Sequence, residues 1–283
     1  MKFSWLEHPL TRGLDLDDPR TTALRLQILQ EKRFLRKLYL EWYGDIAASL
    51  PTGEGEVLEL GSGAGFLREV VPDLITSDIQ RVSGVDLVAD ALALPFDDGA
   101  LRAIVMTNLL HHLSDAEGFL GEAARCVRVG GVVSMIEPWV TPWSNVVYSK
   151  LHHEPFDPAA PTWRLDPGGP LSSANGALPW IIFERDRQRF RREAPAWEIE
   201  RIRRFMPFRY LVSGGVSLRS LMPGWTFGLW SGLERALGPV MGWIAMFAHV
   251  VLRRVEPGPG AGPDQTVFSL RNAKHVMHSK SQP

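Results

Sequence analysis

The sequence predicts an α/β fold built on a doubly wound parallel sheet. Two observations support this prediction: short, continuously apolar runs that suit strands buried on both faces, and helical patterns or turns between these runs. The runs occupy residues 57–60, 74–77, 85–89, 101–107 and 132–136. A glycine turn, Gly61-Ser62-Gly63-Ala64-Gly65, follows the first run directly, so main-chain N–H groups can meet a ligand there.

We expect the 283 residues to form one domain with four parts. Residues 20–50 carry apolar side chains at helical spacing and form an N-terminal helical cap. Residues 51–138 form the ligand-binding core. Residues 139–195 begin with a proline- and glycine-rich stretch, 139–175, which is typical of a substrate lid, and continue into a helix. Residues 196–275 hold the last strands and an apolar helical block.

Local patterns place further elements in this frame. A helix over 65–71 should follow the glycine turn. Ser114-x-x-Glu117 is typical of a capping box that opens the next helix, which Gly130-Gly131 ends. We also expect helices over 144–152 and 177–192, and strands over 197–205 and 266–271.

The block 225–252 is apolar and contains three tryptophans, and its part 236–252 has no Asp, Glu, Lys or Arg. Three interpretations stay open: a buried or pocket-lining helix, a helix that docks on a membrane surface, and a membrane span near the lower length limit. A buried helix is favoured, because a span would have to leave and rejoin the same sheet.

The composition narrows the choice of partners and compartment. The net charge of −1 argues against nucleic acid as the main partner, because nucleic acids select for basic surfaces. Cys126 is the single cysteine, so no disulfide can form within the chain, and the first residues lack the apolar run of a signal peptide. We therefore expect a cytoplasmic protein, with membrane contact through 225–252 as the alternative.

Polar residues follow four of the predicted strands: Asp78, Asp90, Asn108 and Glu137. The carboxyl ends of parallel strands share one edge of a sheet, and ligands bind beyond that edge. A dinucleotide site is disfavoured, because the G-x-G-x-x-G pattern would need a glycine where the chain has Phe66.

Five segments together resemble the class I S-adenosylmethionine-dependent methyltransferases, in the small-molecule branch related to ubiquinone and menaquinone methyltransferases. The segments are VLELGSGAGFL at 57–67, SDI at 77–79, ADALALPF at 89–96, LRAIVMTNLLHHL at 101–113 and RVGGVVSMIEP at 128–138. The resemblance implies a Rossmann-like sheet of seven strands in the order 3-2-1-4-5-7-6, with the last strand antiparallel. The expected strands 197–205 and 266–271 would be the sixth and seventh.

The same resemblance implies S-adenosylmethionine as methyl donor and a role for each matched position. Glu59 would position the methionine end, Asp78 would accept the ribose hydroxyls, and Asn108 would lie near the sulfonium. The whole implied binding set is Glu59, Gly61, Ser62, Gly63, Gly65, Asp78, Ile79, Asp90, Ala91 and Asn108.

A general base is needed only if the acceptor must lose a proton. The candidates are His111, His112, Glu137 and His153, whose side chains can accept a proton near neutral pH. No metal site is expected, because adjacent histidines on a helix, such as His152 and His153, point about 100° apart.

The leading hypothesis is therefore in-line transfer of a methyl group to a small, apolar or amphipathic acceptor, with position and desolvation as the main contributions. Three alternatives remain: a non-catalytic scaffold that keeps the fold, a lipid methyltransferase on a membrane surface, and a nicotinamide oxidoreductase, which the glycine spacing disfavours. The sequence leaves the acceptor, the methylated atom and the oligomeric state open.

Overall fold

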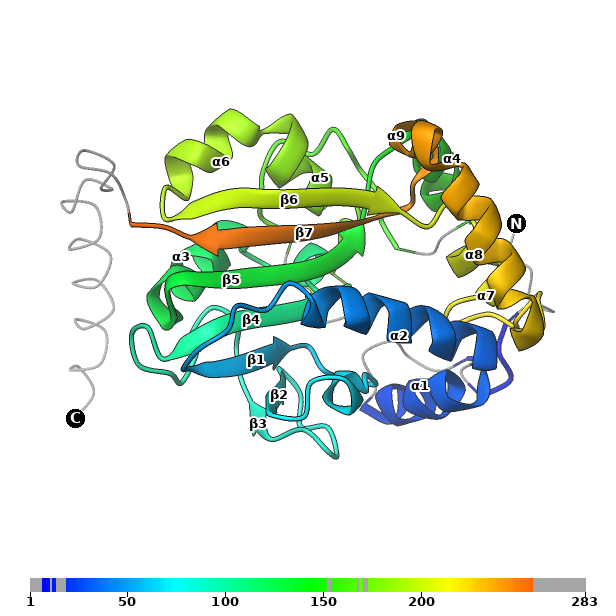
Figure 1. Ribbon diagram of the computed structural model, residues 1–283, viewed down its shortest axis with the longest axis horizontal. Coiled ribbons are helices and arrows are strands. Elements are labelled where there is room, and N and C mark those ends of the chain that lie inside the picture. The colour runs from blue at the N-terminus through cyan, green and yellow to red at the C-terminus, as the bar shows by residue number, and fades with distance from the viewer. Residues whose placement is uncertain are drawn as a thin grey trace, which may run out of the picture.

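The computed structural model describes residues 7–10, 12–13, 19–151, 154–166, 168–169 and 173–256. Within these ranges the strands form one sheet in the order β3-β2-β1-β4-β5-β7-β6 (Figure 1). The strands are β1 (Glu56–Leu60), β2 (Leu74–Asp78), β3 (Leu87–Val88), β4 (Leu101–Thr107), β5 (Val127–Pro138), β6 (Trp197–Phe205) and β7 (Phe247–Arg254). Strands β1 to β5 pair in parallel and β7 is antiparallel to both β5 and β6, which confirms the predicted order.

Helices cover the two faces of this sheet. They are α1 (Pro19–Glu31), α2 (Arg33–Ala47), α3 (Ala116–Cys126), α4 (Pro142–Leu151), α5 (Leu178–Trp180), α6 (Arg187–Glu193), α7 (Arg209–Ser213), α8 (Phe227–Ala236) and α9 (Met241–Ile244). Single 3₁₀ turns occur at Leu67–Glu69, Leu110–His112, Gly224–Thr226 and Gly238–Val240, and a π-helical turn spans Ile181–Arg185.

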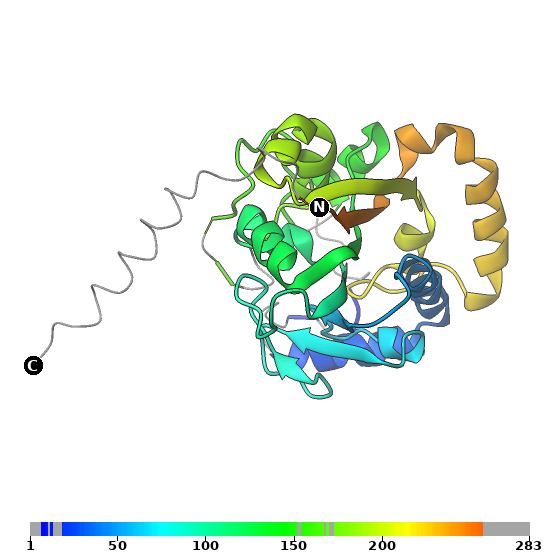
Figure 2. The same cartoon turned by 60° about the vertical axis from the view of Figure 1, so that its left-hand side comes forward.

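Alternate side chains of the strands enter two separate cores. In β4, Ile104 and Met106 join a core with α3, α5 and α6. Ala103 and Val105 of the same strand join a second core with α2 and α4. Figure 2 shows α3 and α6 on one side of the sheet and α2 on the other. Both faces of β4 therefore pack in a core, which explains the continuously apolar run of this strand.

The N-terminal helical region is confirmed, but it is broken into α1 and α2 at Lys32. This lysine is buried, and its ammonium donates to the carbonyl oxygens of Gly215 and Leu218, at 2.5 and 2.9 Å. The break turns α1 away from α2 toward the carboxyl ends of the strands. Burial lowers the pKa of Lys32 to about 8.

The favoured prediction of a buried helix for the apolar block was wrong, because its helical part, α8 and α9, is largely exposed and its last part is a strand. Residues 227–236 and 241–244 are helical, but Phe247–Arg254 is β7, buried between β5 and β6. A strand that is apolar on both faces lacks alternation, so its pattern cannot be told from that of a buried helix. The expected strand 266–271 lies outside the described residues, and β7 takes the place assigned to it. No helix in the described ranges has the length and apolar character to cross a bilayer.

Other local predictions need smaller corrections. The helix expected over 65–71 is only the 3₁₀ turn Leu67–Glu69. Helix α3 is capped by Asp115, whose carboxylate accepts from the Gly118 N–H at 2.9 Å, and not by Ser114. It ends at Cys126, where β5 begins at once. The strand over 197–205 is confirmed, the helical character of 177–192 is confirmed in three short pieces, and α4 covers the described part of 144–152.

The position of β7 predicts unequal costs for two leucine truncations. Leu252 of β7 is fully buried, whereas Leu229 of α8 is 75% exposed. Leu252→Ala should therefore lower the free energy of unfolding by about 2–5 kcal/mol, because it leaves a cavity beside two strands. Leu229→Ala should change it by about 0.5 kcal/mol or less. Denaturant titration of both variants tests this, and equal costs would contradict the buried strand.

Candidate active site

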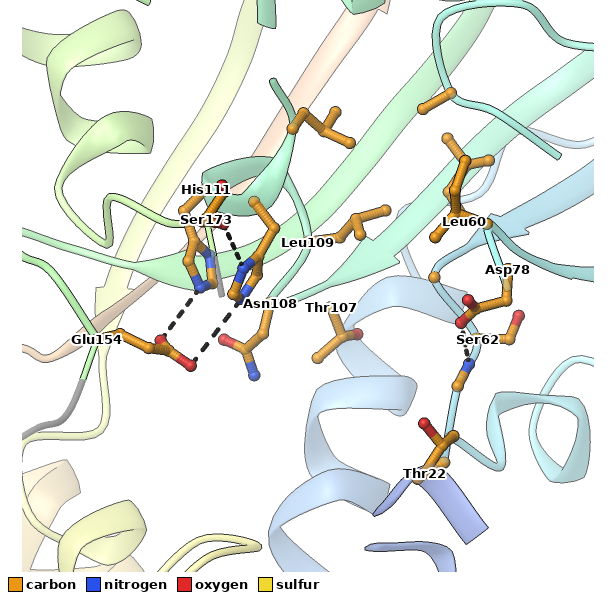
Figure 3. Close-up of a pocket in the computed structure, with 18 of the residues that line it drawn as sticks. Thr22, Leu60, Ser62, Asp78, Thr107, Asn108, Leu109, His111, Glu154 and Ser173 are labelled. Atoms are coloured by element: carbon orange, nitrogen blue, oxygen red, sulfur yellow. Dashed lines mark hydrogen bonds and ion pairs between the residues drawn. The ribbon is translucent and has the colours of Figure 1, made fainter. Parts of the chain in front are cut away.

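A cavity of about 620 Å³ opens at the carboxyl ends of β1, β2 and β4. Its two ends are called here the glycine-turn end, formed by residues 61–65 and Asp78, and the histidine end, formed by His111, His112 and Glu154. Figure 3 shows Asn108 and Thr107 between these ends. A single cavity thus joins both sets of polar groups.

The glycine turn exposes main chain to this cavity. Gly61 has φ +64° and Gly63 has φ +43°, values that L side chains rarely adopt. A Cβ on Gly61 would lie 2.8 Å from Cδ1 of Leu109, and one on Gly65 would lie 2.8 Å from the carbonyl oxygen of Ser62. Backbone conformation therefore requires glycine at Gly61 and Gly63, and close approach of a main-chain oxygen requires it at Gly65.

Asp78 ends β2 and lies beside the glycine turn in the cavity wall (Figure 3). Its Oδ2 accepts from the Gly63 N–H at 3.1 Å, and its Oδ1 accepts from the Gln80 N–H at 2.9 Å. Burial raises the pKa of Asp78, and these two hydrogen bonds oppose the shift. Beside it, Ile79 is 51% exposed and offers an apolar surface to the same cavity.

Glu59 belongs to β1, just before the glycine turn. It lines the cavity, although it is only 4% exposed. Burial raises the pKa of Glu59 to about 7. A buried carboxylate of this kind gains from a cationic ligand group, because the opposite charge offsets the lost hydration.

Asp90 and Ala91 form another part of the wall. Ala91 is buried, whereas Asp90 is exposed and its Oδ1 accepts from the Leu92 N–H at 2.9 Å. This contact makes Asp90 a turn residue as well as a cavity residue. Both residues line the cavity, and their contact with a ligand stays a prediction.

Asn108 and Thr107 occupy the middle of the cavity wall. Asn108 has φ +53°, and its N–H donates to the Ile136 carbonyl oxygen at 2.9 Å, so the backbone turns sharply where β4 ends. Thr107 carries a buried hydroxyl that has no hydrogen-bond partner among the described residues. A buried hydroxyl without a partner is costly, so a bound polar group at this position would be stabilising.

Glu137 does not line the cavity, which corrects its place among the candidate bases. It is fully buried behind His111. Its Oε1 accepts from the N–H groups of Leu109 and Leu110, both at 2.8 Å, and its Oε2 lies 2.6 Å from His111 Nδ1. The side chain therefore holds the turn after β4 in place, and it cannot reach an acceptor.

The two histidines of this turn differ in charge. Burial alone would lower the pKa of His111, but the carboxylates of Glu137 and Glu154 raise it to about 9. Burial and the neighbouring His111 charge lower the pKa of His112 to about 4. At neutral pH and without a further ligand, His111 is a cation and cannot accept a proton, whereas His112 is neutral. His153 lies outside the described residues.

Several cavity residues have no counterpart in the sequence analysis. Thr22, Arg25 and Leu29 of α1 reach the cavity, because the break at Lys32 folds that helix over it. One part of the cavity wall is aromatic and consists of Tyr148, Phe156, Tyr210 and Phe247. The described part of 139–175 contributes Glu154, Phe156 and Ser173, and its role as a lid stays a prediction.

Comparisons with known sequences agree with this geometry. Residues 58–135 match the family described as the methyltransferase domain. The chain is similar to the demethylmenaquinone methyltransferase of Roseiflexus castenholzii, with 32% identity over 110 residues, covering 32% of this chain and 46% of that relative. The chain thus matches less than half the length of the curated relative.

Comparisons with solved structures concern the fold alone, because identities are low. A chain from the complex between the Haloferax volcanii Trm112 methyltransferase activator and a methyltransferase has a TM-score of 0.50 and 14% identity, over 86% of this chain and 98% of that one. The geranyl diphosphate C-methyltransferase of Streptomyces coelicolor has a TM-score of 0.47 and 15% identity, over 88% and 92%.

The family match falls on the glycine turn, Asp78 and Asn108, and the sheet around them has the order expected for the fold. Residues 58–135 are therefore identified as a methyltransferase domain, set in a sheet with the strand order expected for the class I S-adenosylmethionine-dependent methyltransferases.

Proposed function

We propose that the protein transfers a methyl group from S-adenosylmethionine to a small organic acceptor held in the same cavity. The observation that supports this most strongly is the continuity of the glycine-turn end with a second end lined by aromatic and histidine side chains. A donor and an acceptor could thus lie in one cavity of about 620 Å³.

The glycine-turn end has the groups that this donor needs. The Asp78 carboxylate can accept both ribose hydroxyls, and Ile79 and Ala91 can pack on the adenine. The methionine end carries a cationic amine, which would lie near the buried carboxylate of Glu59. The donor supplies an already activated methyl group, so the chain's task is to orient the reactants and exclude water. Holding two reactants in line can account for roughly 7–11 kcal/mol of the barrier.

The aromatic wall favours an apolar or flat acceptor. Tyr148 and Phe156 stack with ring centroids 4.7 Å apart, and Tyr210 meets Phe247 edge-on at 4.9 Å. The Tyr148 hydroxyl has a hydrogen-bond partner within the protein, since it donates to the Met246 carbonyl oxygen at 3.0 Å. Burial raises the pKa of both tyrosines, so their hydroxyls stay neutral and the wall presents rings.

A second proposal concerns where the acceptor comes from. Exposed apolar side chains gather on and beside α8 and α9: Leu221, Trp225, Leu229, Leu233, Val240 and Trp243. We call this set the α8–α9 patch. Tryptophan and leucine on a helix with exposed arginine nearby, here Arg235, suit a lipid membrane surface. We propose that the patch docks there and that an amphipathic acceptor enters from the bilayer of the cytoplasmic side.

Donor binding is tested by calorimetry with S-adenosylhomocysteine. Asp78→Ala should weaken the Kd by about 10–100-fold, because a charge-assisted hydrogen bond contributes about 1.5–3 kcal/mol. The matched control is Asp73→Ala, an exposed acid at the opposite end of β2, which should bind as the parent chain does.

Two outcomes would contradict the donor proposal. Equal Kd values for the two variants would remove Asp78 from the site. Failure of the parent chain to bind either S-adenosylhomocysteine or S-adenosylmethionine would favour the alternative, a scaffold that keeps the fold without turnover.

Membrane docking is tested by co-sedimentation with phosphatidylcholine vesicles that contain an anionic lipid. The double variant Trp225→Asp and Trp243→Asp should lose most of the bound fraction, because two exposed indoles are removed and two charges must enter the interface. The control is Val129→Asp in β5, where the side chain is 51% exposed, and it should change the bound fraction little. If the parent chain stays in solution, the docking proposal is wrong. If the double variant instead changes the oligomeric state, the patch contacts another copy and not a membrane.

A further inference from the structure

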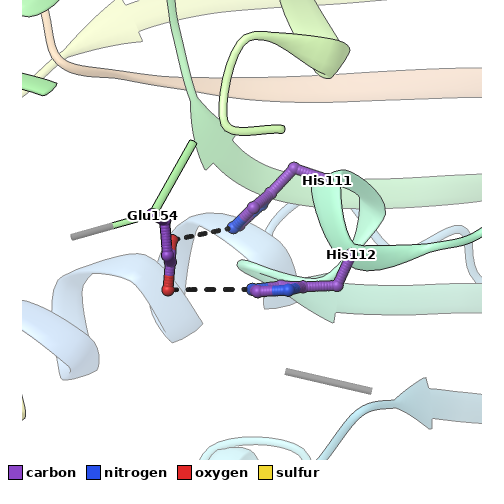
Figure 4. A group of neighbouring side chains, drawn as sticks. All are labelled: His111, His112 and Glu154. Carbon is purple, nitrogen blue, oxygen red and sulfur yellow. Dashed lines mark ion pairs between the residues drawn. The ribbon is translucent and has the colours of Figure 1, made fainter. Parts of the chain in front are cut away.

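Three potential metal ligands converge at the histidine end (Figure 4). The Nε2 of His111 lies 3.6 Å from Oε2 of Glu154, and the Nε2 of His112 lies 4.0 Å from Oε1. One ligand atom from each of the three residues falls within 4.8 Å of the others. His111 and His112 are neighbours in the sequence, and their ring centroids lie only 4.2 Å apart.

Adjacent histidines usually diverge, and the structure explains why these two do not. They belong to the 3₁₀ turn Leu110–His112, and the Nδ1 of each ring makes a polar contact on the side away from Glu154. His111 Nδ1 contacts Glu137, which the N–H groups of Leu109 and Leu110 fix in place. His112 Nδ1 lies 3.0 Å from the Ser173 carbonyl oxygen. These two contacts turn both Nε2 atoms toward Glu154.

The Nδ1 contacts with Glu137 and Ser173 also determine which nitrogen of each histidine can bind an ion. A carbonyl oxygen only accepts hydrogen bonds, so His112 Nδ1 carries the proton and Nε2 has the lone pair. The Glu137 carboxylate accepts the His111 Nδ1 proton in the same way. Histidines that bind metals are generally oriented by a carboxylate or a backbone carbonyl on the second nitrogen, and this turn has one of each.

We propose that His111 Nε2, His112 Nε2 and the Glu154 carboxylate bind one divalent transition-metal ion. Two imidazoles and one carboxylate form a ligand set that suits Zn²⁺, Fe²⁺ or Co²⁺. Ligands about 2.0–2.1 Å from a tetrahedral ion lie about 3.3 Å apart. The observed separations of 3.6 and 4.0 Å would therefore have to close by less than 1 Å.

The place of the ion follows from its ligands. All three line the cavity, and Figure 3 shows His111 and Glu154 on the side of Asn108 away from Asp78. Three protein ligands leave at least one coordination position for another molecule. If the proposed function holds, that position faces the acceptor, and an acceptor oxygen could bind there. Glu154 belongs to the lid, so the ion would also tie the lid to the turn after β4.

The test uses the untagged full chain, dialysed against a chelator and titrated with Co²⁺ and with Zn²⁺. We expect one ion per chain, a visible Co²⁺ absorption band typical of a low-coordinate site, and displacement of Co²⁺ by Zn²⁺. Glu154→Gln and His112→Ala should each weaken the apparent affinity by 10-fold or more. The control is His8→Ala, a histidine outside the cavity, which should leave the affinity unchanged.

A second variant separates orientation from ligation. In Glu137→Gln the amide oxygen can still accept from Leu109 and Leu110, but the amide N–H₂ faces His111 Nδ1. The proton of His111 then moves to Nε2, so the ion loses a ligand while the turn is kept. Metal affinity should fall by about 10–100-fold, as for other contacts that orient metal ligands.

The proposal is overturned if the parent chain binds no Co²⁺ at 100-fold excess. It is equally overturned if Glu154→Gln, a change at a partly exposed lid residue, leaves binding and the spectrum unchanged. Calorimetry with S-adenosylhomocysteine on the same metal-free protein distinguishes this failure from failure of the donor site, because Asp78 and the glycine turn share no ligand with the ion.

Discussion

The arrangement of the cavity depends on one buried carboxylate. Glu137, at the end of β5, accepts two main-chain N–H groups from the turn after β4 and the Nδ1 contact of His111. Without this acceptor, each buried N–H would be left without a partner at a cost of about 1–3 kcal/mol. The turn also contains Asn108 with its positive φ, so the same carboxylate sets the middle of the cavity and its histidine end.

The two ends of the cavity are built by different means. The glycine-turn end is local: residues 59–65 and Asp78 come from two neighbouring strands and their turns. The histidine end is assembled from distant parts of the chain, since His111, Glu137, Glu154 and Ser173 meet through contacts of long sequence separation. The glycine-turn end therefore lies wholly within the residues that match the methyltransferase domain, whereas the histidine end also draws on Glu137, Glu154 and Ser173, which lie outside that match.

This difference explains what could be predicted from the sequence. The strand order and the role of Glu59 followed from the family resemblance, and the order is confirmed. Residues 61–65, 78, 90 and 108 followed from local patterns, and they line the cavity together with Glu59. Phe247–Arg254 could not be recognised as a strand, because a run buried on both faces has no periodicity of its own. Glu137 was expected in the cavity and lies behind it. Arg25 reaches the cavity through the break at Lys32, which has no sequence signature. Glu154 lies in the predicted lid, but no local pattern indicates that its side chain meets His111 and His112.

The central claim is that one cavity orders a methyl donor at the glycine turn and an acceptor at the histidine end. A crystal structure of the protein with S-adenosylhomocysteine tests it most directly. We predict that the ribose hydroxyls contact Asp78 and that the sulfur lies beside Asn108, directed toward His112. An adenosine bound away from the glycine turn, or a sulfur directed away from the histidine end, would contradict the account.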